Sequence, residues 1–206
     1  MKREADKPAK ARGRPRSFDR DEALERAMEL FWRQGYEATS LADLTAAMGI
    51  NPPSLYAAFG DKEHLFLAAV ERYENLGRGP GAGCILEDEP TARGAIERIL
   101  RESAIELSKP SQPKGCMLIT AATNCSAESA HVQRALADRR AAQKKHLKER
   151  IAKGIADGEL ARGTDAGALA DFYATVLTGM SMQSRDGATR KTLLATAEAA
   201  MRAWPE

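Results

Sequence analysis

Hydrophobic residues return every three or four positions along most of this chain, which places them on one face of an α-helix. Between residues 38 and 62 they form two short stripes, and Gly49 interrupts the pattern between them. The apolar positions of this region are Leu41, Leu44, Met48, Ile50, Leu55 and Phe59. The pattern predicts two short helices joined by a tight turn, which is the layout of a helix-turn-helix.

The polar residues around these stripes suit the ends of the two helices. Thr39 and Ser40 offer hydroxyls where the first helix starts, and Pro52 and Pro53 suit a first turn, where a backbone N–H would lack a partner. The residues left at the start or on the outer side of the second helix are Asn51, Pro52, Ser54, Tyr56 and Ala57. Such a helix fits the major groove of DNA, although an ordinary pair of packed helices has the same spacing.

The same periodicity predicts helices in the rest of the chain. One helix is predicted over residues 19–34, capped by Ser17 or Asp19 and ended by Gly35, and another follows Gly60 and Asp61. Further helices are predicted over residues 91–108, 115–125, 127–157, 165–185 and 189–204. β-branched residues alternate over no more than a few positions, so the predicted fold class is all-α.

The first sixteen residues carry a strong positive charge. They hold seven basic and two acidic residues, a charge of +5, whereas the whole chain has a net charge of +2. A basic segment poor in apolar residues attracts polyanions by releasing their counterions. Arg14 and Arg16 at its end suit a narrow minor groove. A solubilising tail would have the same composition.

The order of certain residues between positions 31 and 66 matches a known family. These residues are Phe31-Trp32, Gly35-Tyr36, Thr39-Ser40, Gly49-Ile50, Ser54-Leu55-Tyr56, Phe59, Lys62 and Leu65-Phe66. The segment resembles the N-terminal DNA-binding domain of TetR-family transcriptional regulators, over about sixty of the 206 residues. The resemblance implies a three-helix helix-turn-helix DNA-binding domain, followed by a larger helical domain for ligand binding and dimerisation.

The resemblance also implies roles for single residues. Thr39 and Ser40 match the cap that contacts phosphates, and Lys62 matches a lysine that meets the DNA backbone. Pro53, Ser54 and Tyr56 match the recognition helix, whereas Asn51 and Pro52 lie where such proteins vary to select their operators. The predicted DNA-contacting set is therefore Arg14, Arg16, Thr39, Ser40, Asn51, Pro52, Pro53, Ser54, Tyr56 and Lys62.

The chain is predicted to divide into three parts. Residues 1–16 form a disordered basic arm, residues 17–76 the DNA-binding domain, and residues 77–206 the regulatory and dimerisation domain. A Gly- and Pro-rich stretch, residues 77–90, is predicted to break any helix and to act as a mobile connection. It is not interpreted as a phosphate loop, because no strand precedes it and no Gly-Lys-Ser follows.

The last two predicted helices carry regular apolar stripes. The stripe residues are Ala166, Leu169, Phe172, Tyr173, Val176, Leu177, Met180, Leu194, Ala197, Met201 and Trp204. Burial inside one subunit explains them as well as an interface does. The resemblance favours a homodimer that joins two helices from each chain into a four-helix bundle through residues 165–204.

The resemblance further implies that an unknown small-molecule effector binds between the middle helices and releases the DNA. The candidate lining residues are Ile99, Ser103, Met117, Thr120, Asn124, Tyr173 and Leu177, with Ile96, Leu100, Ala121 and Leu147 beside them. Apolar residues at helical spacing also describe an ordinary core, and the polar members could satisfy backbone groups instead. Whether the protein represses or activates is not encoded in these residues, and the resemblance favours repression.

Three cysteines, Cys84, Cys116 and Cys125, show neither a disulfide framework nor metal-ligand spacing. Cys116 follows Lys114 and Gly115 at a predicted helix N-terminus, where a helix dipole and a lysine would favour the thiolate. Gly115-Cys116-Met117-Leu118 also resembles a subgroup of these regulators in which cysteine modification triggers release. Thiol sensing at Cys116 is therefore an alternative, against the ordinary role of a buried cysteine as a small hydrophobe.

Other function classes find little support in the sequence. His64, His131 and His146 are scattered, and no catalytic motif is present, so we expect no enzyme, no metal site and no cofactor. No apolar run approaches the roughly 20 residues of a membrane span, and no signal peptide is apparent. The expected location is the cytoplasm. An architectural protein that binds any duplex remains an alternative, although the modest net charge argues against it.

Overall fold

The computed structural model describes residues 18–78 and 83–205, except for the side chains of residues 83–85. This part of the chain forms ten α-helices and no strand, as the predicted all-α class requires. The helices are α1 (Arg20–Gln34), α2 (Leu41–Met48), α3 (Pro52–Phe59), α4 (Lys62–Asn75), α5 (Gly83–Asp88), α6 (Ala92–Leu107), α7 (Met117–Thr120), α8 (Ala130–Ala156), α9 (Ala166–Arg185) and α10 (Arg190–Met201).

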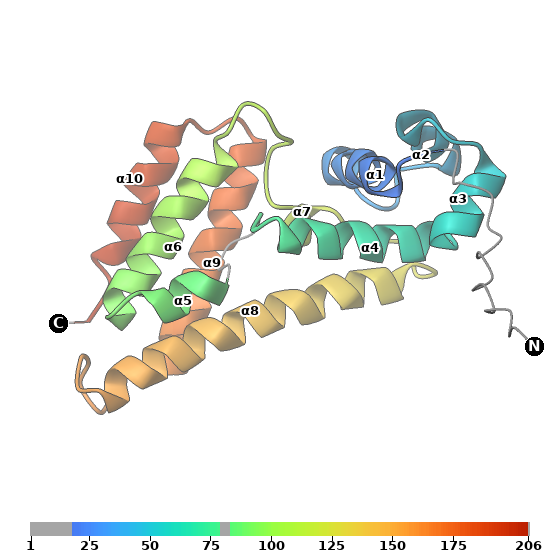
Figure 1. The fold of residues 1–206 in the computed structure, drawn as a ribbon. Helices are drawn as coiled ribbons and strands as arrows, with labels where there is room; N and C mark the ends of the chain where they lie inside the picture. Colours follow the sequence, from blue (N-terminus) through green and yellow to red (C-terminus); the bar gives the residue numbers. More distant parts are fainter. Residues whose placement is uncertain (1–17, 79–82, 206) are drawn as a thin grey trace, which may run out of the picture.

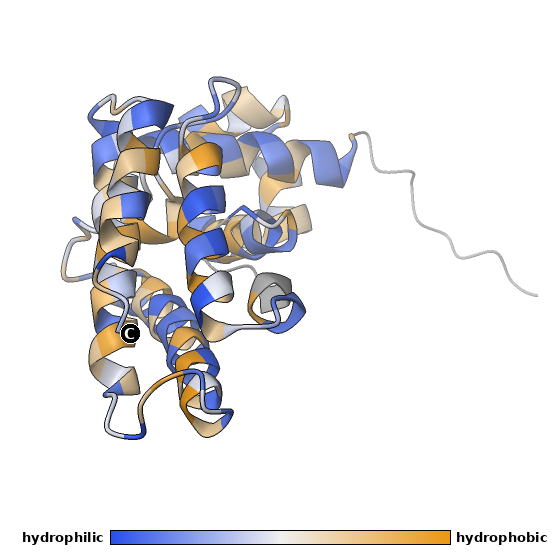
Figure 2. Ribbon diagram, turned by 90° about the vertical axis from the view of Figure 1, so that its left-hand side faces the viewer, coloured by the Kyte–Doolittle hydropathy of each residue, from blue (hydrophilic) through white to orange (hydrophobic). Residues whose placement is uncertain are grey.

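The helices form two groups that share a boundary at α4, α7 and α8 (Figure 1). Helices α1 to α4 make a small unit in which α1 packs on α4 and α2. In the larger group α6 packs against α10, and the long α8 crosses and packs on α9 (Figure 1). Hydrophobic and hydrophilic residues alternate at helical spacing along these helices, so each long helix has one apolar and one polar face (Figure 2).

Side-chain caps set the start of each helix in the small unit. The Asp19 carboxylate accepts from the backbone N–H of Asp21 and of Glu22, and α1 begins there. Ser40 and Asp43 form a capping box at α2. Asn51 accepts from the Ser54 N–H at 2.8 Å and starts α3, with proline at the first two helical positions as the sequence predicted.

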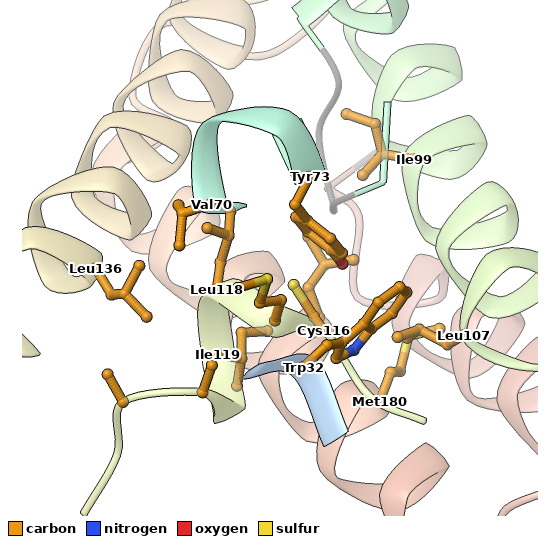
Figure 3. Packing of buried hydrophobic residues seen from close by; sticks show 14 of the residues in the cluster. Trp32, Val70, Tyr73, Ile99, Leu107, Cys116, Leu118, Ile119, Leu136 and Met180 are labelled. Atoms are coloured by element: carbon orange, nitrogen blue, oxygen red, sulfur yellow. The ribbon is translucent and has the colours of Figure 1, made fainter. Parts of the chain in front are cut away.

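An aromatic cluster holds α1 against α4 and extends into the larger group. Phe31 and Phe66 meet edge to face with ring centroids 5.0 Å apart, and Trp32 and Tyr73 do so at 4.9 Å. Figure 3 shows Trp32 and Tyr73 beside Cys116, which precedes α7. The indole N–H of Trp32 donates to the Gly115 carbonyl at 2.9 Å, so the core runs without a break between the two groups.

Two sequence-based predictions of secondary structure were wrong. The stretch 77–90 was predicted to break any helix, yet it contains α5, because Leu86 is buried where α5 packs on α6 and α8. The helix predicted over residues 115–125 is only the single turn Met117–Thr120. Beyond this turn the Ala121 carbonyl accepts the Tyr36 N–H at 2.7 Å, so it bonds to the small unit and not along a continued helix.

Candidate DNA-binding surface

The outer side of α3 is exposed to solvent, as a recognition helix that contacts DNA bases requires. Leu55 and Phe59 are buried and fix the helix on the small unit. Tyr56 is 49% exposed, which is unusual for a large aromatic side chain. Asn51, Pro52 and Pro53 are exposed at the N-terminus of α3 and Ser54 is partly exposed, so the structure gathers this part of the predicted set on one surface.

Ser40 and Lys62 lie at the N-termini of the helices on either side of α3. Ser40 is exposed and caps α2. Lys62 is half-buried at the first position of α4, and its ammonium nitrogen is 4.4 Å from the ring centroid of Tyr36. Burial lowers the pKa of Lys62, and the charge of Glu37 partly offsets this. Both positions are compatible with the backbone contacts that the resemblance implied, and helix N-termini favour anions.

Thr39 does not have the position that the resemblance implied. Its side chain is fully buried, and its hydroxyl donates to the Gly35 carbonyl at 2.6 Å. Its backbone N–H is bonded to the Tyr36 carbonyl. A contact between the Thr39 hydroxyl and a phosphate would require this turn to open, so we assign Thr39 to holding the turn before α2. Arg14 and Arg16, together with the whole basic arm 1–16, lie outside the described residues.

The turn at α7 connects the small unit to the helices of the larger group. On one side the Gly115 carbonyl accepts from the Trp32 indole N–H, and the Ala121 carbonyl accepts from the Tyr36 backbone N–H. On the other side the Cys116 N–H donates to the Ser181 hydroxyl at 2.8 Å, and the Gly115 N–H donates to the Ser184 hydroxyl at 3.3 Å. Ser181 and Ser184 belong to α9, so α1 and α9 bind the same short stretch of backbone.

The candidate ligand residues are divided between the buried core and two separate cavities. Ile99, Ser103, Met117 and Tyr173 are buried, and burial raises the pKa of Tyr173 to about 12. Thr120 and Asn124 line a cavity of about 360 Å³ between the α1–α2 connection and α9. Leu177 lines a different cavity of about 50 Å³. Sequence periodicity identified core residues here, but it could not separate core from ligand pocket.

Cys116 has the predicted position but not the predicted chemistry. It is the residue directly before α7, and it is only 1% exposed. Burial raises the pKa of its thiol, although the Tyr73 hydroxyl opposes this shift. Lys114, which was expected to favour the thiolate, is exposed and donates to the Lys109 carbonyl instead. The physical argument for a favoured Cys116 thiolate was therefore wrong.

The histidines occupy ordinary positions. His131 pairs with Glu63 at 2.8 Å, which joins α8 to α4, and His64 pairs with Asp61 at the N-terminus of α4. Over residues 18–78 and 83–205, three His, Cys, Asp or Glu side chains never gather in an arrangement that could hold a metal ion. Every helix in the same part of the chain is too short or too polar to cross a lipid bilayer.

Comparison with known families accounts for both groups of helices. Residues 23–69 match the family model for bacterial regulatory proteins of the tetR family, and residues 95–203 match the tetracyclin repressor-like C-terminal domain. The chain belongs to the TetR family. As a TetR-family member it is a DNA-binding regulator of transcription and not an enzyme, as the sequence predicted, and the family acts as dimers.

Similar proteins span the whole TetR fold. The HTH-type transcriptional repressor ComR of Escherichia coli strain K12 is 38% identical over 197 residues, which cover 96% of this chain and 94% of that protein. The repressor BdcR of the same strain is 35% identical, covering 93% of this chain and 91% of that protein. A cysteine mutant of the TetR-family regulator CifR, solved with 26-base-pair operator DNA, is 48% identical with a TM-score of 0.89, covering 93% of this chain and 100% of that chain.

Proposed function

We propose that this TetR-family protein is a repressor that binds an approximately palindromic operator as a homodimer and leaves it when a small-molecule inducer binds. The repressors ComR and BdcR, similar over nearly the whole chain, support this direction of control. Repression and release require only that the inducer bind the DNA-incompetent conformation more tightly than the competent one. Regulators of transcription act where the chromosome lies, which supports the cytoplasmic location expected from the sequence.

The observation that carries the proposal is the free N-terminal surface of α3. Asn51, Pro52, Pro53 and Ser54 present small or compact groups that allow close approach to base edges, and Tyr56 adds a rigid exposed hydroxyl. Ser40 and Lys62 stand on the adjacent helices, where they meet phosphates on both sides of the groove. Arg14 and Arg16 of the basic arm reach the neighbouring minor groove in this scheme.

The outward faces of α9 and α10 are the proposed dimer interface. Most of the predicted stripe, including Tyr173 and Trp204, is buried inside the subunit. The opposite side of α9 exposes Phe172, 41% accessible, and Met182, 45% accessible, with Gly179 between them. Small and apolar exposed residues on α9 and α10 suit a four-helix contact with a second copy. We also propose the domain boundaries given by the sequence, 1–16, 17–76 and 77–206.

Selection of bound DNA from a random pool with the full-length protein tests this function. We expect a single enriched motif with two inverted half-sites, since a twofold dimer presents two copies of α3. Ser54→Ala should change the enriched bases, whereas Lys148→Ala, an exposed lysine on α8, should leave them unchanged. Recovery of unenriched DNA by the wild-type protein would favour the architectural alternative and refute the proposal.

Two other roles receive less support. Thiol sensing at Cys116 would require reagents to reach a buried thiol with a raised pKa. Binding to any duplex would call for basic residues spread over the surface, whereas much of the described basic charge is paired within the protein, as in the ion pair of Arg72 with Glu25 at 2.6 Å.

A further inference from the structure

A cavity of about 540 Å³ lies between α8 on one side and the end of α5 with the segment that joins α5 to α6 on the other. Leu86 and Pro90 supply apolar wall on one side. His146, Arg150 and Lys153 supply basic groups from one face of α8, and they are spaced about one helical turn apart. Figure 1 shows α5 lying against the C-terminal half of α8, at a distance along the molecule from α3. The cavity is separate from the proposed DNA-binding surface.

Arg150 is the unusual member of this lining. Its side chain is only 7% exposed. One terminal nitrogen, Nη2, donates to the Glu89 carbonyl at 3.3 Å and lies 3.8 Å from a Glu159 carboxylate oxygen. The other, Nη1, is buried and has no hydrogen-bond partner within the protein. Within residues 18–78 and 83–205 it is the single buried side-chain nitrogen or oxygen in that condition.

A buried charged donor without an acceptor is costly, and such groups call for a partner. The nearby carboxylates are already engaged: Glu159 also accepts from the Ala92 N–H, and Glu89 pairs with Arg98 at 3.1 Å. The vacant Nη1 donor of Arg150 therefore points to an acceptor supplied from outside the chain. A guanidinium matches the geometry of a carboxylate, which can accept from both of its terminal nitrogens.

The other charges around the cavity restrict the ligand. Glu149 pairs with Lys145 at 3.6 Å, Lys153 pairs with Asp157, and Glu87 is exposed at the rim. Three carboxylates thus line one cavity with only two permanent cations, Arg150 and Lys153, which disfavours a multiply charged anion such as a phosphate ester. A single negative charge at Arg150, with an apolar body against Leu86 and Pro90, fits both the charge and the walls.

We propose that this cavity binds a small monocarboxylate, with its carboxylate on Arg150 and its apolar part against Leu86 and Pro90. The further step, that this cavity is the inducer site, rests on the proposed function. Helix α8 pairs with α4 through His131 and Glu63 and through Arg139 and Glu74. A ligand that shifts α8 at Arg150 therefore acts on α4, which directly follows the reading helix α3.

Binding is tested first without DNA, on the full-length protein, by isothermal calorimetry with benzoate and octanoate against benzamide and octanamide. We expect binding of at least one carboxylate and none of its amide. Arg150→Met should weaken that binding about tenfold or more, because a charged hydrogen bond is lost. Arg150→Lys keeps the charge but not the paired donors, so it should bind at an intermediate level. Arg134→Met, an exposed arginine on α8, is the matched control and should bind like wild type.

The outcomes separate the site from the proposed function. Equal binding of acid and amide, no binding of either acid at 10 mM (roughly −2.7 kcal/mol), or wild-type binding by both Arg150→Met and Arg150→Lys would overturn the site. Each variant's circular dichroism spectrum is compared with wild type, so that a folding defect is not read as lost binding. Release of a selected operator by the bound carboxylate, measured by fluorescence anisotropy, supports the inducer role. Arg150-dependent binding without release refutes that role and leaves the site standing.

Discussion

Gly35 ends α1 at the junction between the small unit and α7, and replacing it with alanine tests how rigid that junction is. Its backbone has φ 83° and ψ 169°, a region that is essentially restricted to glycine. A Cβ at this position would lie 3.1 Å from the Ala121 carbonyl oxygen. That oxygen already accepts the Tyr36 N–H at 2.7 Å, so it cannot retreat without lengthening an existing hydrogen bond.

The expected cost has two parts. Holding a residue with a side chain in this backbone region costs about 1–3 kcal/mol. Weakening the hydrogen bond between Tyr36 and Ala121 adds about 1 kcal/mol. Gly35→Ala should therefore lower the free energy of unfolding by about 2–4 kcal/mol. Because relief of the clash moves α1 away from α7, operator affinity should also fall about tenfold, which corresponds to about 1.4 kcal/mol.

Gly158→Ala is the control for the backbone effect. Gly158 has φ 84°, and a Cβ there would have no atom within 4 Å. It should cost about 1–2 kcal/mol from its backbone conformation and leave operator affinity unchanged. Both variants are unfolded in urea at one protein concentration, since the stability of a dimer depends on concentration. Operator affinity is measured by anisotropy at fixed salt.

Two results would refute this reasoning. If Gly35→Ala were no less stable than Gly158→Ala, the approach to Ala121 would not be limiting. If Gly35→Ala were destabilised but bound its operator with wild-type affinity, the contact between α1 and α7 would not set the position of the reading helix.

Three further predictions concern separate features of the molecule. Lys62→Ala should weaken binding to all duplexes alike and reduce the slope of log affinity against log salt by about 1, whereas Lys148→Ala on α8 should not; a change in operator preference instead would contradict a backbone contact. Since burial raises the pKa of Cys116, iodoacetamide at pH 7.5 should label it slowly in the native protein and rapidly in urea; equal rates by mass spectrometry would contradict the buried thiol. Gly179→Leu should yield monomers in light scattering, whereas Ala152→Leu on α8 should remain dimeric; a dimeric Gly179→Leu would place the interface elsewhere.

Much of the fold could be predicted because its signals are local. Asn51 with the two prolines marked the start of α3, and Gly35 and Gly49 marked the ends of α1 and α2. The period of the apolar residues placed Leu55 and Phe59 inward, which left the reading surface outward. These features depend on neighbours within about one turn of helix, so a single sequence contains them.

The remaining features depend on contacts between distant segments. The burial of Thr39 follows from the turn that packs beneath α7, and the raised pKa of Cys116 follows from the core around it. Helix α5 is held by α6 and α8 in spite of its glycine-rich sequence. No sequence pattern marked Arg150 as a site residue, because it is one of many basic residues on α8 and only tertiary packing buries it. Local patterns carry none of this information.

The backbone at Gly115 and Cys116, which binds α1 on one side and α9 on the other, has a consequence for the assembled dimer. In the dimer proposed above, a change in how the two copies of α9 cross would be passed to Ser181 and Ser184, then to this peptide, and then to Trp32. The subunit contact would therefore help to set the spacing between operator half-sites that the protein tolerates. Substitutions far from DNA, on the α9 surface, should alter the preferred number of base pairs between half-sites while leaving the bases within each half-site unchanged.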